Sequence, residues 1–155
     1  MATIAIGQII PPFEAEATSG RRLSLESFKG RYLVLYFYPK DSTPGCTVEG
    51  QNFRDLYPNF QALNADIVGV SRDSLKSHEN FKCKQSFPFE LLSDTNEAVC
   101  RLFDVIRLKN MYGKEVLGIE RSTFLIGPDG RLVAEWRKVS VKEHAQKVLD
   151  TLQGL

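Results

Sequence analysis

Runs of apolar residues alternate along this chain with stretches in which apolar residues recur every third or fourth position. The densest run, RYLVLYFY at Arg31–Tyr38, is rich in β-branched and aromatic side chains and stops at Pro39. Such a run is typical of a strand covered on both faces. Further strands are predicted at Asp66–Ser71, Phe89–Leu92, Ser122–Ile126 and Arg131–Trp136. Because Pro128-Asp129-Gly130 separates the last two, they are expected to form a hairpin.

Helical spacing predicts four helices between and after these strands. They span Cys46–Asn64, Ser74–Gln85 (capped by Asp73 or Ser74), Asp94–Asp104 and Val141–Leu152. Pro58 lies inside the first helix and is expected to kink it or to split it. The order β-α-β-α-β-α-β-β-α predicts an α/β sandwich of thioredoxin-like layout, in which helices flank a central mixed sheet. At 155 residues, the whole chain (1–155) fits one such domain.

Charge excludes some functions. With 20 Lys+Arg against 19 Asp+Glu, the net charge of +1 gives no reason to expect nucleic acid or an anionic membrane as partner. Residues 1–12 show neither the basic nor the apolar region of a secretory signal, and no apolar run reaches the roughly 18 residues of a membrane span. We therefore expect a cytoplasmic protein.

The chain has three cysteines, Cys46, Cys83 and Cys100, which is too few for a disulfide scaffold. There is no CxxC pair. His78 and His144 lie far from the Cys46 loop in sequence, so we expect ordinary helix residues there, no zinc site and no cofactor. In a reducing compartment each cysteine is either a small packing residue or a redox group.

The segment PKDSTPGC, from Pro39 to Cys46, joins a buried strand to a helix through a polar loop. Cys46 is thereby placed in the first helical turn, where unpaired N–H groups and the positive end of the helix dipole favour a thiolate. A thiolate is the nucleophile needed to attack an O–O bond. A small buried cysteine at a strand–helix turn is the alternative, against which the polar loop argues.

These residues resemble the peroxiredoxin motif PxxxTxxC, which Pro39, Thr43 and Cys46 match at its three fixed positions. The wider stretch YFYPKDSTPGCTVE is similar to the bacterioferritin-comigratory, or PrxQ, subfamily. The resemblance extends from Pro11–Phe13, which it implies is an entry strand, through GIERSTF, at Gly118–Phe124, to Trp136.

The resemblance implies a role for each matching residue. Cys46 would be the peroxidatic cysteine, and Thr43 would place its hydroxyl against the thiolate and the peroxide. Pro39 would shield the pocket from water besides ending the strand. Arg121 would bring a fixed positive charge to the sulfur, although a residue opening a strand is more often a plain surface charge. Glu49, three residues after Cys46, either orients the arginine or is a surface residue of the helix.

The implied cycle reduces hydrogen peroxide and organic hydroperoxides. Cys46 becomes a sulfenic acid, a second thiol forms a disulfide with it, and thioredoxin reduces that disulfide. Many PrxQ proteins carry the second cysteine five residues after the first, where this chain has Gln51. Another branch carries it on the following helix, which Cys83 fits. Cys100 is the second choice, because it flanks an apolar stripe.

The placement of Cys83 agrees with this assignment. Helical geometry projects it with Lys76 and Asn80 on a polar side, opposite His78 and Phe81. Because a disulfide needs Cα atoms within about 7 Å, we expect local unwinding on oxidation. Alternatives are a one-cysteine peroxidase resolved by a partner's thiol, a disulfide exchanger of the same fold, and a non-enzymatic binding module. The family resemblance implies a monomer.

Overall fold

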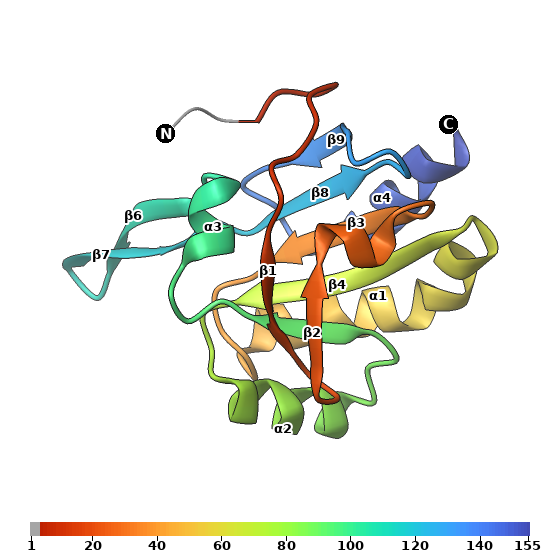
Figure 1. Cartoon of the computed structure of the whole chain (residues 1–155). Coiled ribbons are helices and arrows are strands. Elements are labelled where there is room, and N and C mark those ends of the chain that lie inside the picture. The colour runs from red at the N-terminus through yellow and green to blue at the C-terminus, as the bar shows by residue number, and fades with distance from the viewer. Residues whose placement is uncertain (1–3) are drawn as a thin grey trace.

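The computed structural model describes residues 4–155, which fold around a seven-stranded mixed sheet (Figure 1). The strand order is β2-β1-β5-β4-β3-β8-β9. The parallel strands β3, β4 and β5 form the middle. Strand β8 pairs antiparallel with β3, and β9 pairs antiparallel with β8. The strands of this sheet are β1 (Glu14–Ala17), β2 (Arg21–Ser24), β3 (Tyr32–Phe37), β4 (Ala65–Ser71), β5 (Glu90–Ser93), β8 (Ser122–Ile126) and β9 (Leu132–Trp136).

Strand β3 is central because both of its faces are apolar. Leu33, Leu35 and Phe37 enter one core cluster, and alternate residues such as Val34 and Tyr36 enter the other. Successive side chains of a strand point to opposite faces, so one continuous apolar run supplies both cores. The expectation of a strand covered on both faces is confirmed.

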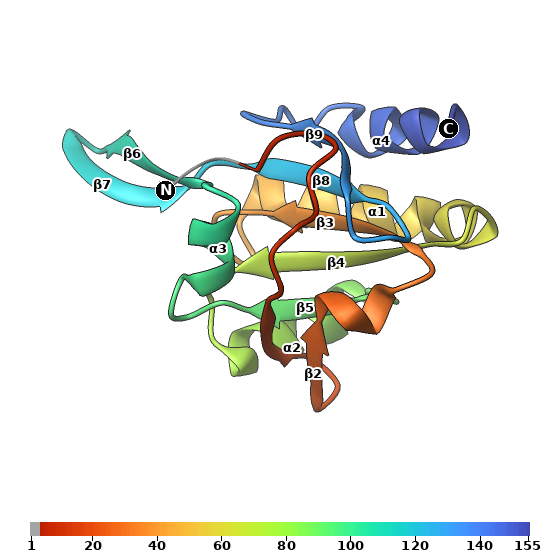
Figure 2. The same ribbon diagram turned by 45° about the horizontal axis from the view of Figure 1, so that its top comes forward.

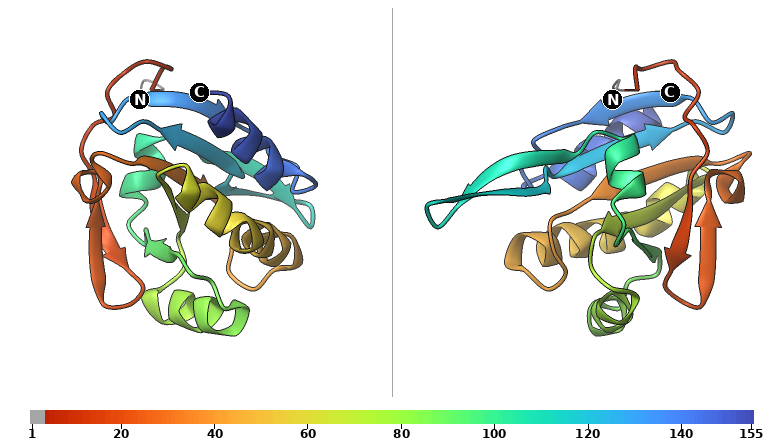
Figure 3. Two further views of the ribbon diagram at one scale, coloured as in Figure 1. Left: turned by 90° about the vertical axis from the view of Figure 1, so that its right-hand side faces the viewer. Right: turned by 60° about the vertical axis from the view of Figure 1, so that its left-hand side comes forward.

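Helices cover both faces of the sheet (Figures 2 and 3). They are α1 (Pro44–Ala62), α2 (Leu75–Gln85), α3 (Ala98–Leu102) and α4 (His144–Gln153), with a short 3₁₀ turn at Leu25–Phe28. Phe53 of α1, Phe81 of α2 and Val148 of α4 share one core cluster. Cys100 and Phe103, within and just after α3, belong to the cluster on the opposite face. The predicted thioredoxin-like arrangement, with helices flanking a mixed sheet, is confirmed. No described helix is long and apolar enough to cross a membrane.

Several predicted boundaries need correction. The helix expected from Asp94 is confined to Ala98–Leu102, because Glu97 and Asp104 both adopt left-handed backbone angles. A left-handed Glu143 likewise delays the last helix from Val141 to His144. Helix α1 continues through Pro58, so a split there is wrong, while the alternative expectation of a kink stays a prediction. The entry strand begins at Glu14, after Pro11 and Pro12, which lack the N–H that a sheet ladder uses.

A second, two-stranded sheet was not predicted. Strands β6 (Ile106–Met111) and β7 (Lys114–Ile119) form an antiparallel hairpin that projects from the body of the molecule (Figures 1 and 3). Tyr112 and Gly113 make its two-residue turn, both at positive φ, as a type I′ hairpin turn requires. The chain then enters β8 beside the end of β3.

Candidate active site

Cys46 occupies the first turn of α1, immediately beyond the carboxyl end of β3. Thr43 is the N-cap and Pro44 the first helical residue, a position where the missing N–H of proline costs no helical bond. The backbone N–H of Thr47 makes the first helical bond, to the carbonyl of Thr43. The N–H groups before it have no acceptor within the helix, so the end of the helix presents donors near the sulfur. Cys46 itself is only 2% exposed.

Arg121 lies against this sulfur although it is far away in sequence. Ser122, the first residue of β8, pairs with Phe37, the last residue of β3. Since Cys46 follows β3 and Arg121 precedes β8, the antiparallel register brings both to the same edge of the sheet. The Nη2 group of Arg121 donates to Cys46 Sγ at 3.4 Å, so Arg121 is not a plain surface charge.

Glu49 completes the group around the sulfur. Arg121 Nη1 donates to Glu49 Oε1 at 2.6 Å, so one guanidinium bridges a carboxylate and a sulfur. Glu49 is 1% exposed, which excludes the surface alternative for this residue. Burial raises its pKa to about 7, an effect that the guanidinium partly offsets. Burial acts to lower the pKa of Arg121, but Glu49 and Cys46 outweigh it and the pKa is raised, so the guanidinium stays charged.

Thr43 and Pro39 lie in the loop that leads to Cys46. The Thr43 hydroxyl donates its proton to the carbonyl oxygen of Lys40 at 2.8 Å, which braces the loop. Its predicted contact with a thiolate and a peroxide therefore remains a prediction. Pro39 is half-buried, two residues beyond the end of β3, which agrees with its strand-ending role.

The two other cysteines differ sharply in environment. Cys100 is fully buried, and burial together with nearby Asp94 raises its pKa far above the ordinary value, so it is a packing residue. Cys83 is exposed on α2, as the helical projection predicted. All three cysteines are unpaired.

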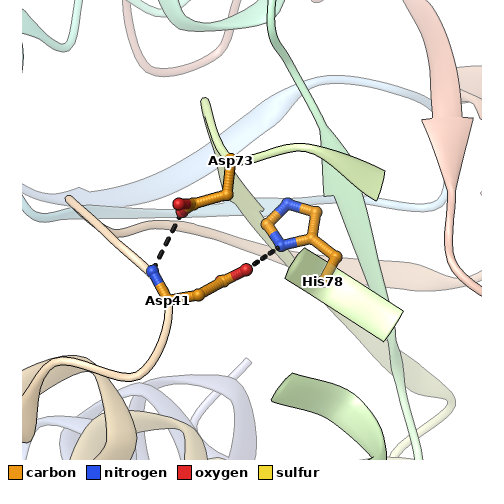
Figure 4. A group of neighbouring side chains, drawn as sticks. All are labelled: Asp41, Asp73 and His78. Atoms are coloured by element: carbon orange, nitrogen blue, oxygen red, sulfur yellow. Dashed lines mark hydrogen bonds and ion pairs between the residues drawn. The ribbon is translucent and has the colours of Figure 1, made fainter. Parts of the chain in front are cut away.

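A buried polar cluster beside the Cys46 loop was missed by sequence reasoning. Asp41, Asp73 and His78 each place one nitrogen or oxygen within 4.8 Å of the others (Figure 4). Asp41 and His78 hydrogen-bond directly, and Asp73 accepts from the backbone N–H of Asp41. These atoms thus already satisfy one another, unlike the open ligands of a metal site. The available clue was that His78 shares the apolar side of its helix with Phe81, since a histidine there needs a buried partner.

Known proteins of similar sequence carry peroxiredoxin names. A model of the AhpC/TSA family matches residues 6–135. Peroxiredoxin Bcp of Xanthomonas campestris is 59% identical over 137 residues, which cover 88% of this chain and 86% of the relative. Peroxiredoxin Bcp of Bacillus subtilis is 51% identical, and the match covers 99% and 98% of the two chains.

Solved structures agree with the sequence matches. A structure of the Xanthomonas bacterioferritin comigratory protein, studied for alkyl peroxide reduction, superposes with a TM-score of 0.88 at 56% identity and covers 92% and 90% of the chains. A cysteine-to-serine variant of Xylella fastidiosa PrxQ superposes with a TM-score of 0.93 at 45% identity, covering 99% and 98%. With a buried cysteine at a helix start and an arginine on its sulfur, the chain belongs to the AhpC/TSA family, in its peroxiredoxin Bcp, or PrxQ, branch.

Proposed function

We propose that this thiol peroxidase uses Cys46 as the peroxidatic cysteine and Cys83 as the resolving one. The observation that carries the first assignment is the Arg121 guanidinium, which donates to Cys46 Sγ and is held from its other side by Glu49. A fixed cation at the sulfur stabilises a thiolate, and its donors can also hold the oxygen on which charge develops as the O–O bond breaks. Thr43 and Pro39 complete the pocket that receives the hydroperoxide.

In the first step, the Cys46 thiolate attacks one oxygen of the hydroperoxide. An S–O bond forms, the O–O bond breaks, and the leaving alkoxide or hydroxide takes a proton to become an alcohol or water. Arg121 stabilises the charge that moves from sulfur to oxygen. Cys46 is oxidised to a sulfenic acid, and the peroxide is reduced.

In the second step, the Cys83 thiolate attacks the sulfenic sulfur, an S–S bond forms, and hydroxide leaves as water after taking a proton. A dithiol then reduces the disulfide by exchange, and we propose thioredoxin for this role. Support for Cys83 comes from its exposure and from the inert burial of Cys100. Structures of the Xanthomonas relative include two variants in which a single cysteine is replaced by serine.

We also propose that residues 1–155 work as a single domain, as a monomer, and in the cytoplasm. The support is a single large sheet whose two faces carry the two core clusters, together with three unpaired cysteines of the kind kept in a reducing compartment.

The test is stopped-flow peroxide consumption with thioredoxin as reductant. Cys46→Ser should abolish turnover, whereas Cys83→Ser should keep the first oxidation and lose the disulfide. Cys100→Ser is the matched control and should retain both. Mass spectrometry should find a Cys46–Cys83 disulfide after one equivalent of peroxide. A mixed disulfide or a lasting sulfenic acid in the wild type would instead support a one-cysteine enzyme, and full activity in Cys46→Ser would refute the proposal.

Disulfide formation also requires a change of shape, because Cys46 is buried and Cys83 is exposed. Hydrogen exchange should therefore speed up in the first turn of α1, in α2, or in both when the protein is oxidised. Equal protection in the reduced and oxidised forms would contradict the proposed pairing.

A further inference from the structure

One buried polar network joins the segment leading to Cys46 with the helix that carries Cys83. Asp41 lies five residues before Cys46, and His78 lies five residues before Cys83. The side chains of Asp41 and His78 are 2% and 0% exposed, and His78 Nδ1 lies 2.7 Å from Asp41 Oδ2 (Figure 4). The two segments approach each other here through charged or polar atoms that water cannot reach.

The neighbours of the His78 ring indicate that a proton lies between His78 and Asp41. His78 Nε2 lies 3.0 Å from the carbonyl oxygen of Leu92, which can only accept, so Nε2 carries a hydrogen. If Nδ1 were bare, its lone pair would face a carboxylate oxygen at 2.7 Å, which is repulsive. A proton therefore lies between Asp41 and His78.

Two hydroxyl groups hold the Asp41 side chain as well. It accepts from the Tyr38 hydroxyl at 2.6 Å and from the Ser77 hydroxyl at 2.8 Å. Asp41 and His78 thus lie at the centre of a hydrogen-bonded group that is closed off from solvent.

A second contact fastens the same loop to the start of α2. Asp73, just before the N-cap Ser74, accepts from the backbone N–H of Asp41 at 2.9 Å and from the Ser71 hydroxyl. The loop is thus held by its backbone at the beginning of α2 and by its side chain one turn further on. Moving α2 away from the loop breaks the contacts of Asp41 with Ser77 and His78.

We infer that Asp41 and His78 form a latch that keeps the enzyme in its closed, peroxide-reactive shape, and that opening this latch precedes the Cys46–Cys83 disulfide. The inference rests on the proposed function. Both are positioning residues, because neither touches the reacting sulfur. Removing one partner of a buried hydrogen-bonded pair leaves a polar atom of the other unpaired, so either single substitution favours the open shape.

The latch also sets the fate of the sulfenic acid. While the site is closed, the Cys46 sulfenic acid cannot meet Cys83, and a second peroxide can oxidise it to a sulfinic acid with loss of water from that peroxide. A weaker latch shortens this waiting time. It therefore favours the disulfide over the sulfinic acid.

The experiment compares His78→Leu and Asp41→Asn with Ser77→Ala. The last variant removes only the hydrogen bond from the Ser77 hydroxyl to Asp41, so it should still fold. Val148→Ala is the control, since it weakens the core under α4 without touching the latch. We expect disulfide formation, followed by stopped-flow fluorescence, to become about tenfold faster in His78→Leu. Ser77→Ala should give a smaller acceleration and Val148→Ala none. The sulfinic fraction at excess peroxide should fall in the same order.

Hydrogen exchange of the reduced protein, measured in a Cys83→Ser background, separates this inference from the choice of resolving cysteine. Residues 40–47 and 75–83 should exchange faster in His78→Leu than in Val148→Ala. If they do not, or if Val148→Ala accelerates disulfide formation equally, the latch is refuted. If they do exchange faster but no variant forms the Cys46–Cys83 bond, the latch stands and Cys83 is the wrong resolver.

Discussion

At the scale of single residues, the site depends on one side chain that contacts two partners. Arg121 reaches the sulfur of Cys46 through one terminal nitrogen and the carboxylate of Glu49 through the other. A planar guanidinium holds both contacts at once because its donors have a fixed geometry. A lysine would keep the charge but offers a single flexible nitrogen.

We therefore expect Arg121→Lys to slow the first oxidation of Cys46 by about 10²-fold, the usual loss when a positioned donor to developing charge is removed. The measurement is the second-order rate constant with hydrogen peroxide. Arg101→Lys is a matched control, because Arg101 pairs with Glu97 at an exposed site. A rate within twofold of wild type in Arg121→Lys would mean that charge alone is enough.

Sequence alone reached some of these residues and not others. Cys46 was predictable because strand, polar loop and helix start are all local features. Arg121 lies 75 residues from Cys46 in sequence, and only the family resemblance placed it at the sulfur. Local sequence patterns predict strands, but they do not predict which strands pair. Glu49 stayed ambiguous, since its helical position does not reveal what packs over it. His78 was misjudged for the same reason, as its partner Asp41 lies on another element.

At the scale of elements, a helix or strand was predicted correctly where capping or turn residues mark both of its ends. Helix α2 is capped at its start by Ser74, whose side chain accepts from the N–H of Ser77, and at its end by a left-handed Ser86. The β6–β7 hairpin is marked only by Gly113 in its turn. Its strands, IRLKNM and KEVLGI, mix apolar with charged residues, and Leu108 and Leu117 are more than half exposed, so their strand pattern is weak.

The contact between α1 and the chain after α2 gives a prediction about packing. A Cβ atom on Gly50 would lie 2.3 Å from Cζ of Phe87. The Phe87 ring is stacked on Phe89 at 5.1 Å between centroids and meets Phe81 edge-on at 5.0 Å, so it cannot swing aside without disturbing both.

Gly50→Ala should therefore lower the free energy of unfolding by up to about 2 kcal/mol. Overpacking of a core typically costs about 1–3 kcal/mol, which outweighs the gain of about 1 kcal/mol that alanine brings to a helix interior. Urea denaturation measures the change. Adding Phe87→Leu to this variant should recover part of the lost stability. If Gly50→Ala instead raised the free energy of unfolding, the Phe87 ring would be able to move aside at little cost.

At the scale of the whole molecule, two buried groups give stability opposite dependences on pH. Burial raises the pKa of Glu49 from 4.5 to about 7. Burial, helped by Lys147 and Arg121, lowers the pKa of His144 from 6.5 to about 4, while its Nε2 lies 2.7 Å from the Thr123 hydroxyl. Both side chains are less than 5% exposed, so solvent screens neither pKa shift to any great extent.

The two signs follow from linkage. Glu49 binds a proton more tightly in the folded state. Its contribution to folding stability is therefore fully present below pH 4.5 and is lost as the pH rises through about 7. His144 binds a proton less tightly when folded, so its contribution is present above pH 6.5 and is lost as the pH falls toward about 4. Between pH 7.5 and 5, each amounts to about 2 kcal/mol, and the two nearly cancel.

Substituting one of these two residues should reveal the pH dependence of stability that the other contributes. On going from pH 7.5 to pH 5, Glu49→Gln should lose about 2 kcal/mol of stability relative to wild type, and His144→Gln should gain about as much. Urea denaturation of the three reduced proteins at both pH values measures these differences, and other titrating groups cancel in the comparison. The double variant should again follow the wild type, because both opposing contributions are then absent. Parallel pH profiles for all four proteins would mean that water reaches Glu49 and His144 in the folded state.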